Sequence, residues 1–313
     1  MLNILAITAP IYLLILLGFV AVRSGIFTRA DMKVLGQFVL RFALPALLFK
    51  TLSQRSVADI LNGRFLLAYA GGSLLVFALG WLWARRRPAS YRAFIGMGMS
   101  FSNSGFVGAP VLLQWLGPPA SVALALAMLV ENLIMLPLVL ILAERDNSAT
   151  GQRPALAAAI GQALKPLTRH PLILAIVAGF VCAALGVVLP APLARAVDLL
   201  ANASAGVALM VIGGSLVGLQ LQGLRGDLAA VAIGKLLLHP LAVGVLVLSL
   251  LPDESLLRTA AIGLAAMPML SIYPVLAQKY RHDGFCAAAL LVTTVLSFFT
   301  LSGLIWLLSN WGA

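Results

Sequence analysis

Residues 228–251 read LAAVAIGKLLLHPLAVGVLVLSLL, a run that contains a single charged side chain, Lys235. Because an α-helix rises 1.5 Å per residue, about 20 apolar residues cross the roughly 30 Å hydrocarbon layer of a bilayer. The run does not alternate between apolar and polar residues, which excludes a transmembrane strand. This stretch therefore predicts a membrane-spanning helix.

Nine further apolar segments share this character and are separated by charged residues and by clusters of Pro and Gly. Of the 313 residues, 62% are hydrophobic and only 10% are charged, whereas a soluble domain carries roughly 25% charged residues. The sequence therefore predicts an all-α integral membrane protein with ten transmembrane helices. The predicted spans are 3–22, 33–53, 64–83, 91–116, 120–143, 170–189, 194–219, 228–250, 256–280 and 285–308.

The two halves of the chain form a weak internal repeat. GFV at 18–20 matches GFV at 179–181, and PVL at 110–112 matches PVL at 274–276, at nearly the same offset. Since five spans is an odd number, the second copy must enter the membrane inverted, an arrangement found in many secondary transporters. We expect a first five-helix repeat at 1–143, a cytoplasmic linker at 144–169 and a second, inverted repeat at 170–313.

The distribution of Lys and Arg predicts how the helices are oriented. The loops on one side hold 14 of these residues and the opposite loops hold 5. Because cytoplasmic loops carry the excess, both termini should face outside. These loops also account for the net charge of +11, whereas a nucleic-acid partner would need a basic patch on one soluble face. We expect a multi-pass protein of a cell membrane, the inner membrane of a bacterium, surrounded by lipid and without a nucleic-acid partner.

Two of the predicted helices contain polar, proline-rich stretches. Residues 102–110 read SNSGFVGAP, and residues 267–274 read MPMLSIYP. Proline lacks a backbone donor and clashes with the carbonyl four residues earlier, so both helices should be broken near mid-membrane. Irregular backbone is tolerated there where it is buried in protein or lines a wet cavity, and the exposed ends of half-helices favour an anion. A simple proline kink is the alternative for each helix.

Three ionisable side chains fall inside predicted spans: Arg41, Glu131 and Lys235. Each costs roughly 2.5 to 3.5 kcal/mol at a helix centre and so needs a partner or a purpose. Desolvation favours the protonated form of Glu131, which stands beside Asn132, so Glu131 is a candidate proton carrier or a structural carboxylate paired with one of the two cations. Lys235 is near enough to the cytoplasm to snorkel, and could contact an anion or take the place of a coupling cation. His239 is a titratable candidate or a satisfied core residue.

At these residues the chain resembles the auxin efflux carrier family, which includes the plant PIN-FORMED auxin exporters and bacterial carriers often called malonate transporters. The most specific match is an asparagine seven residues before a proline, Asn103 and Pro110, and helix 8 is similar in having Lys235 five residues before Pro240. The resemblance covers nearly the whole chain. It implies a fold of the bile-acid symporter and sodium–proton antiporter type, with crossed, proline-broken helices 4 and 9. Helices 1, 2, 6 and 7 would form a scaffold and a homodimer contact, and the remaining helices would carry the substrate in an elevator motion.

The resemblance also implies that Asn103 contacts a substrate carboxylate beside the crossing prolines. Ser271 and Tyr273 stand where the plant proteins tend to have a glutamine, which argues against auxin itself as the substrate. The expected substrate-binding residues are Asn103, Ser104, Pro110, Lys235, Ser271, Tyr273 and Pro274, and the coupling candidates are Arg41, Glu131, Asn132 and His239.

The favoured function is secondary active transport of a small mono- or dicarboxylate, coupled to protons or driven by the membrane potential. A sodium-coupled symporter of the bile-acid type is the alternative within transport, although no cluster of acidic and carbonyl ligands suggests a sodium cage. An intramembrane enzyme is the rival class, but neither H-E-x-x-H nor G-x-S-x-G occurs. We therefore expect no enzymatic activity, no cofactor and no bound metal.

Overall fold

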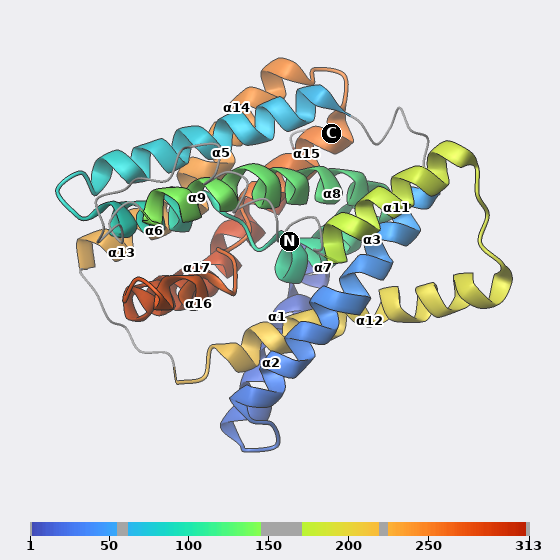
Figure 1. The fold of residues 1–313 in the computed structure, drawn as a ribbon, viewed down its shortest axis with the longest axis horizontal. Coiled ribbons are helices and arrows are strands. Elements are labelled where there is room, and N and C mark those ends of the chain that lie inside the picture. The colour runs from blue at the N-terminus through green and yellow to red at the C-terminus, as the bar shows by residue number, and fades with distance from the viewer. Residues whose placement is uncertain (1, 55–61, 145–170, 219–224, 311–313) are drawn as a thin grey trace. The chain divides into compact units, whose positions relative to one another are not determined.

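The computed structural model describes residues 2–54, 62–144, 171–218 and 225–310 (Figure 1). These residues form helices joined by turns, and no strand occurs among them. The predicted linker at 144–169 lies outside the described residues except for Glu144. Its expected cytoplasmic position therefore stays a prediction.

Each of the ten predicted spans contains helix within the described residues. Four spans correspond to one helix each: α1 (Leu2–Arg23), α5 (Gly63–Trp83), α12 (Ala191–Ser215) and α17 (Asp283–Asn310). A fifth is the shorter α11 (Pro171–Leu185). The other spans are composite: α2 (Arg29–Phe38), η1 (Val39–Ala43) and α3 (Leu44–Ser53); α6 (Ala89–Ser100), η2 (Ser104–Gly108) and α7 (Ala109–Leu116); η3 (Pro118–Ala120), α8 (Ser121–Val130), η4 (Glu131–Met135) and α9 (Leu136–Ala143); α13 (Arg225–Ile233), η7 (Gly234–Leu238) and α14 (His239–Leu250); and α15 (Ser255–Ala265) and α16 (Tyr273–Gln278).

Length and apolarity support a multi-pass membrane protein. Among the described residues, six stretches are long and apolar enough to cross a bilayer: Arg29–Ser53, Gly63–Trp83, Pro118–Ala143, Ala191–Ser215, Arg225–Leu250 and Asp283–Asn310. Three apolar helices are shorter: Ala9–Arg23, Pro171–Leu185 and Ser255–Ala265. The count of ten spans and the inversion of the second repeat stay predictions.

The fourth and ninth predicted helices are interrupted, as expected from their sequences. α6 ends at Ser100, and residues 101–103 are not helical before the chain enters η2. α15 ends at Ala265, and residues 266–272 are not helical before α16 begins. The first interruption precedes Pro110 by several residues, because Pro110 fits the first turn of α7, where its missing donor is not needed.

Four helical stretches contain a five-residue π-turn that ends two residues before a proline. These turns are η1, η2, η4 and η7, and the prolines are Pro45, Pro110, Pro137 and Pro240. The residue before the proline donates to the carbonyl five residues back, as Leu44 does to Val39, Leu136 to Glu131 and His239 to Gly234. Since proline cannot continue the α-helical bonding pattern, the turn before it widens.

The three ionisable residues singled out from the middle of predicted spans all lie in these widened turns. Arg41 is in η1, Glu131 opens η4 and Lys235 is in η7. π-Turns occur frequently at functional sites. The prolines are therefore associated with altered backbone geometry at each of these charged residues. This effect is separate from the two helix interruptions.

The chain forms two compact units, and each draws on both halves of the sequence. Unit 1 comprises Met1–Gly63, Ser104–Leu126 and Arg169–Gly218, and unit 2 comprises Arg64–Asn103, Ala127–Thr168 and Leu219–Ala313. Unit 1 thus contains the predicted helices 1, 2, 6 and 7, and also 104–126, which belong to the predicted helices 4 and 5. The units therefore match the expected division into scaffold and carrying helices only in part. The chain passes from unit 2 to unit 1 between Asn103 and Ser104.

Unit 1 is built on very close packing between α1 and α12. A Cβ atom added to Gly213 would lie 1.7 Å from the carbonyl oxygen of Ile15, and one added to Gly18 would lie 2.0 Å from that of Met210. These backbones approach so closely that only glycine fits, as at other small-residue contacts between membrane helices. α11 packs along α3 in the same unit.

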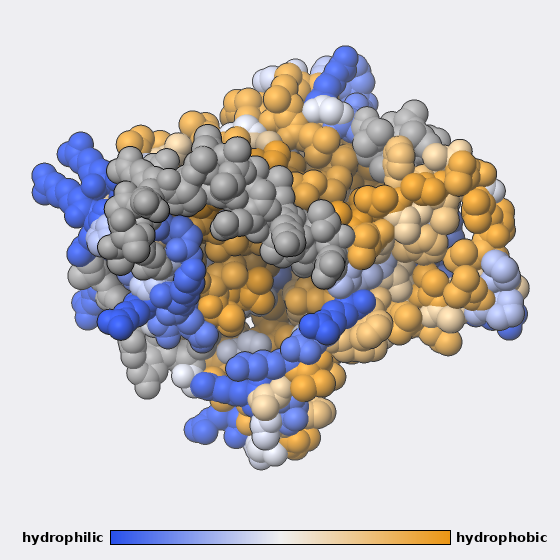
Figure 2. All heavy atoms as spheres, in the orientation of Figure 1, coloured by the Kyte–Doolittle hydropathy of each residue, from blue (hydrophilic) through white to orange (hydrophobic). Residues whose placement is uncertain are grey.

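Unit 2 pairs α5 with α14 and encloses a polar interior. Gly72 of α5 faces the backbone of Val243 on α14, and the two helices run side by side in Figure 1. The outer surface of α5 is apolar, with Leu67, Leu75 and Leu82 each more than half exposed. Figure 2 shows apolar residues over much of the visible surface, as expected where helices face lipid.

Candidate functional site

Asn103 joins the two helix interruptions within unit 2. Its backbone N–H donates to the carbonyl of Pro268 at 2.8 Å, and its side-chain Nδ2 donates to the hydroxyl of Ser271 at 2.6 Å. Pro268 and Ser271 both lie in the interruption between α15 and α16. Asn103 is buried, with 1% of its surface exposed, whereas Ser271 is half-buried.

The local sequence explains why these bonds form. Phe101 leaves α6 in an extended conformation, so the residues after it cannot use the helical bonding pattern. Buried backbone donors and acceptors need partners, and in a membrane protein water does not supply them in the hydrocarbon layer. The non-helical residues around Pro268 provide such a partner for Asn103.

Lys235 lies beside this junction with its ammonium group fully enclosed. Its Nζ donates to the hydroxyl of Ser102 and to the carbonyl of Ala265, each at 2.7 Å, and lies 2.7 Å from Nδ1 of His239. None of its surface is exposed. The expectation that Lys235 snorkels is therefore wrong. The position of a residue along a helix predicts its depth in the membrane but not the direction of its side chain. Here the side chain points into unit 2, where three polar groups contact Nζ.

His239 extends the polar cluster towards α5. Its Nε2 is 2.9 Å from the hydroxyl of Ser73, and its ring meets that of Tyr69 edge to face, with centroids 6.0 Å apart. His239 is fully buried and has a polar neighbour at each ring nitrogen. A coupling role for His239 stays a prediction.

Glu131 is buried in unit 2 and accepts a hydrogen bond from a tyrosine. The hydroxyl of Tyr69 donates to its carboxylate at 3.1 Å. Asn132 instead bonds back to the carbonyl of Met128 in its own helix at 2.7 Å. Arg41 is an exposed residue of unit 1.

The remaining predicted residues fall in both units. Tyr273 is buried in unit 2, and its hydroxyl donates to the carbonyl of Phe94 at 2.6 Å, which holds the start of α16 against α6. Pro274 follows it in the first turn of α16. Ser104 and Pro110 are buried in unit 1. Unit 2 thus brings together Asn103, Ser271, Lys235, His239 and Glu131.

A family model described as membrane transport protein matches residues 4–305. The chain belongs to this family, the auxin efflux carrier family. It is similar to a protein of Rhizobium meliloti (strain 1021) named "Putative malonate transporter", with 32% identity over 319 residues that cover 99% of this chain and 97% of that protein. It is also similar to "Uncharacterized transporter YfdV" of Escherichia coli (strain K12), with 27% identity over 241 residues, 75% of each chain.

Membership of the auxin efflux carrier family confirms two interpretations of the sequence. The protein is a membrane transporter, and it belongs to a class of carriers, not of enzymes. The family resemblance inferred from Asn103 and Pro110 is also confirmed. The names of the relatives do not decide its substrate.

Several residues at the site were not selected from the sequence. Ser102 and Pro268 stand within the two quoted stretches, but nothing distinguished them from their neighbours. Tyr69 and Ser73 are four residues apart and so share one face of α5. A polar pair on one face of a largely apolar helix is the sequence feature that could have identified these two residues.

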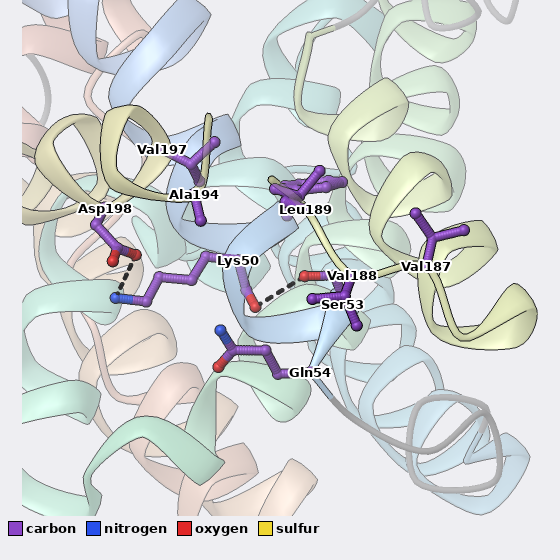
Figure 3. Close-up of a pocket in the computed structure, with 10 residues that line it drawn as sticks. Lys50, Ser53, Gln54, Val187, Val188, Leu189, Ala194, Val197 and Asp198 are labelled. Carbon is purple, nitrogen blue, oxygen red and sulfur yellow. Dashed lines mark hydrogen bonds and ion pairs between the residues drawn. The ribbon is translucent and has the colours of Figure 1, made fainter. Parts of the chain in front are cut away.

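A cavity of about 290 Å³ lies in unit 1, apart from the predicted residues (Figure 3). Its polar lining includes Lys50 and Asp198, which form an ion pair at 2.8 Å, and Ser53, whose hydroxyl donates to the carbonyl of Lys50 at 3.1 Å. Both charges of the pair are partly exposed. Val187 and Val188 contribute apolar lining.

Proposed function

We propose that the protein is a secondary active transporter of a small organic carboxylate, and that Asn103 contacts the substrate. The observation that carries this proposal is the pair of hydrogen bonds that joins Asn103 to Pro268 and Ser271. They bring two interrupted helices to one buried point in a family of membrane carriers. The name of the Rhizobium meliloti relative makes malonate the first dicarboxylate to test.

The chemistry of this junction suits a carboxylate. An asparagine amide carries two donors, and one of them reaches the hydroxyl oxygen of Ser271. A carboxylate oxygen is a stronger acceptor than a hydroxyl, since charged hydrogen bonds are roughly twice as strong as neutral ones. A substrate that replaces Ser271 at this amide would therefore keep Asn103 satisfied while gaining a charge-assisted bond. Tyr273 and Pro274, which belong to the same unit, would shape the surroundings. Substrate-binding roles for Ser104 and Pro110 of unit 1 stay predictions.

Glu131 is the proposed proton carrier. It is buried beside the hydroxyl of Tyr69, in the same unit as Lys235. A buried carboxylate that takes up and releases a proton could link transport to a pH gradient. His239 and Lys235 belong to the same buried cluster.

The architecture proposed for transport has ten spans in two inverted repeats and an elevator motion. Unit 1, which gathers helices 1, 2, 6 and 7, would be the scaffold and homodimer contact, and unit 2 would carry the substrate. The tight α1–α12 packing in unit 1 and the polar interior of unit 2 support this assignment. The protein would lie in a bacterial inner membrane with both termini outside. Labelling a single cysteine at either terminus of intact cells tests that orientation, starting from a variant without Cys182 and Cys286.

Uptake into proteoliposomes tests the function. A panel of mono- and dicarboxylates, malonate included, would be offered under an imposed proton gradient, sodium gradient or membrane potential. We expect accumulation of at least one carboxylate that a proton gradient or potential drives, and none in protein-free vesicles. Accumulation that requires sodium would favour the bile-acid type of symport instead. No uptake or counterflow of any carboxylate would contradict the proposal.

A further inference from the structure

Lys235 is enclosed by three polar partners that come from three parts of unit 2. Ser102 belongs to the first interruption, Ala265 is the last residue of α15 at the second, and His239 lies one turn along the same helical stretch as Lys235. All three atoms lie 2.7 Å from Nζ. An ammonium group has three N–H donors and no acceptor. The partners therefore match its full donor set.

The partners are arranged as they would be around a small cation. The carbonyl of Ala265 is one of the last in α15, and the C-terminal carbonyls of a helix carry partial negative charge. The hydroxyl of Ser102 adds a second oxygen next to Asn103. If Nδ1 of His239 accepts from Lys235, its Nε2–H is free to donate to Ser73, 2.9 Å away. The ring is then neutral, and α5 fixes its tautomer.

We infer that Lys235 is a positioning residue that acts as a built-in cation, tethering the two interrupted helices so that transport needs no bound alkali metal ion. This inference rests on the proposed function and assigns Lys235 a role without substrate contact, because its three donors are already engaged. Glu131 is buried in the same unit. When its carboxylate is ionised, it offsets part of the buried positive charge, which would otherwise be costly.

Replacement of the side chain by a soluble amine tests the role of the charge. Lys235→Ala removes a propylammonium-sized group. We expect it to lower the melting temperature of the purified protein and to slow carboxylate uptake by about 10- to 100-fold, the usual effect of losing a bond to a charged group. Propylammonium ion should restore both, whereas 1-propanol, of similar length but uncharged, should restore neither. A side chain that only fills space would respond equally to both compounds.

Two controls complete the test. Lys50→Ala removes a lysine from the partly exposed ion pair of unit 1, and propylammonium should change neither its melting temperature nor its uptake. Wild-type uptake should be the same when choline replaces sodium and potassium, a measurement that does not depend on any variant folding.

The outcomes separate this inference from the proposed function. A sodium requirement in the wild type, an unimpaired Lys235→Ala variant, or equal rescue by propylammonium and 1-propanol would each overturn the built-in cation. If propylammonium restores the melting temperature of Lys235→Ala but the wild type moves no carboxylate, the tether stands and the proposed substrate class fails.

Discussion

The two units differ in whether their ionisable side chains are buried. Among the described residues, the buried charged and histidine side chains are Glu131, Lys235 and His239, and all three belong to unit 2. The buried polar side chains that the structure describes in unit 1 are serines, at 104, 121 and 204. Arg41, a charge well inside a predicted span of unit 1, is exposed.

This difference indicates that the two units have different roles. Unit 1 relies on backbone-to-backbone contact at Gly18 and Gly213, which leaves little room for rearrangement. Unit 2 accepts the desolvation of three ionisable groups, and membrane proteins keep such groups where function needs them. Substitutions in unit 1 should therefore act on folding, and those in unit 2 on transport.

The largest effect is expected at the α1–α12 contact of unit 1. Gly213→Ala would place a methyl group 1.7 Å from the carbonyl oxygen of Ile15, so the helices must separate. We expect loss of most folded protein, measured as the monodisperse fraction in size-exclusion chromatography. Gly206→Ala on the same helix is the control, because nothing lies within 4 Å of its added Cβ. Normal folding of Gly213→Ala would show that unit 1 is not rigid at this contact.

Next in size is the effect of removing the Asn103 amide from unit 2. A hydrogen bond to a charged group contributes roughly 1.5 to 3 kcal/mol, and about 1.4 kcal/mol is tenfold in affinity. We therefore expect Asn103→Ala to weaken carboxylate binding by about 10- to 100-fold at normal expression, measured by titration of the purified protein. Ser100→Ala is the control, because that hydroxyl bonds only within α6, to Gly96. Unchanged affinity in Asn103→Ala would remove the proposed substrate contact.

A more selective effect is expected at Glu131. Glu131→Gln keeps an oxygen that can accept from Tyr69 but cannot ionise, so accumulation driven by a pH gradient should be lost. Counterflow exchange needs no net proton movement and should persist. Asn132→Ala, which removes a bond within its own helix, should keep both activities. Accumulation by Glu131→Gln under a pH gradient would make this carboxylate structural.

The smallest effect is expected at the ion pair in the cavity of unit 1. Lys50 and Asp198 are partly exposed, and pairs of this kind contribute about 0 to 1 kcal/mol. Asp198→Asn should therefore shift the melting temperature slightly and leave uptake unchanged. A large loss of uptake in this variant would show that residues of unit 1 also take part in transport. It would contradict the conclusion that transport depends on unit 2 alone.

Apolar runs predicted most of the fold, and they did so because lipid imposes length and composition on helices. Both interruptions were also predictable, since SNSGFVGAP and MPMLSIYP are unusual inside a span. The position of the first was not, because Pro110 fits the start of α7 and the break falls at 101–103. A proline in the sequence indicates that a helix is interrupted nearby, but it does not show how many residues away the interruption lies.

The candidate site was predicted only in part. Asn103, Lys235 and Glu131 were recognisable because polar and charged residues are costly in lipid. Their partners were not recognisable. Ser102, Ser73 and the carbonyl of Ala265 contact the site only because helices that are distant in the sequence pack together. The direction of Lys235 was missed for the same reason.

The four proline-linked π-turns also bear on how this chain should be aligned with its relatives. A π-turn holds one residue more than the α-turn it replaces, so each acts as a single inserted residue and rotates the helix beyond it by about 100°. A relative that lacks Pro240 should therefore also lack one residue within Gly234–Leu238. An ungapped comparison across that point would assign the lysine to the wrong face of its helix and overlook that the two proteins differ in helical register, not only in sequence.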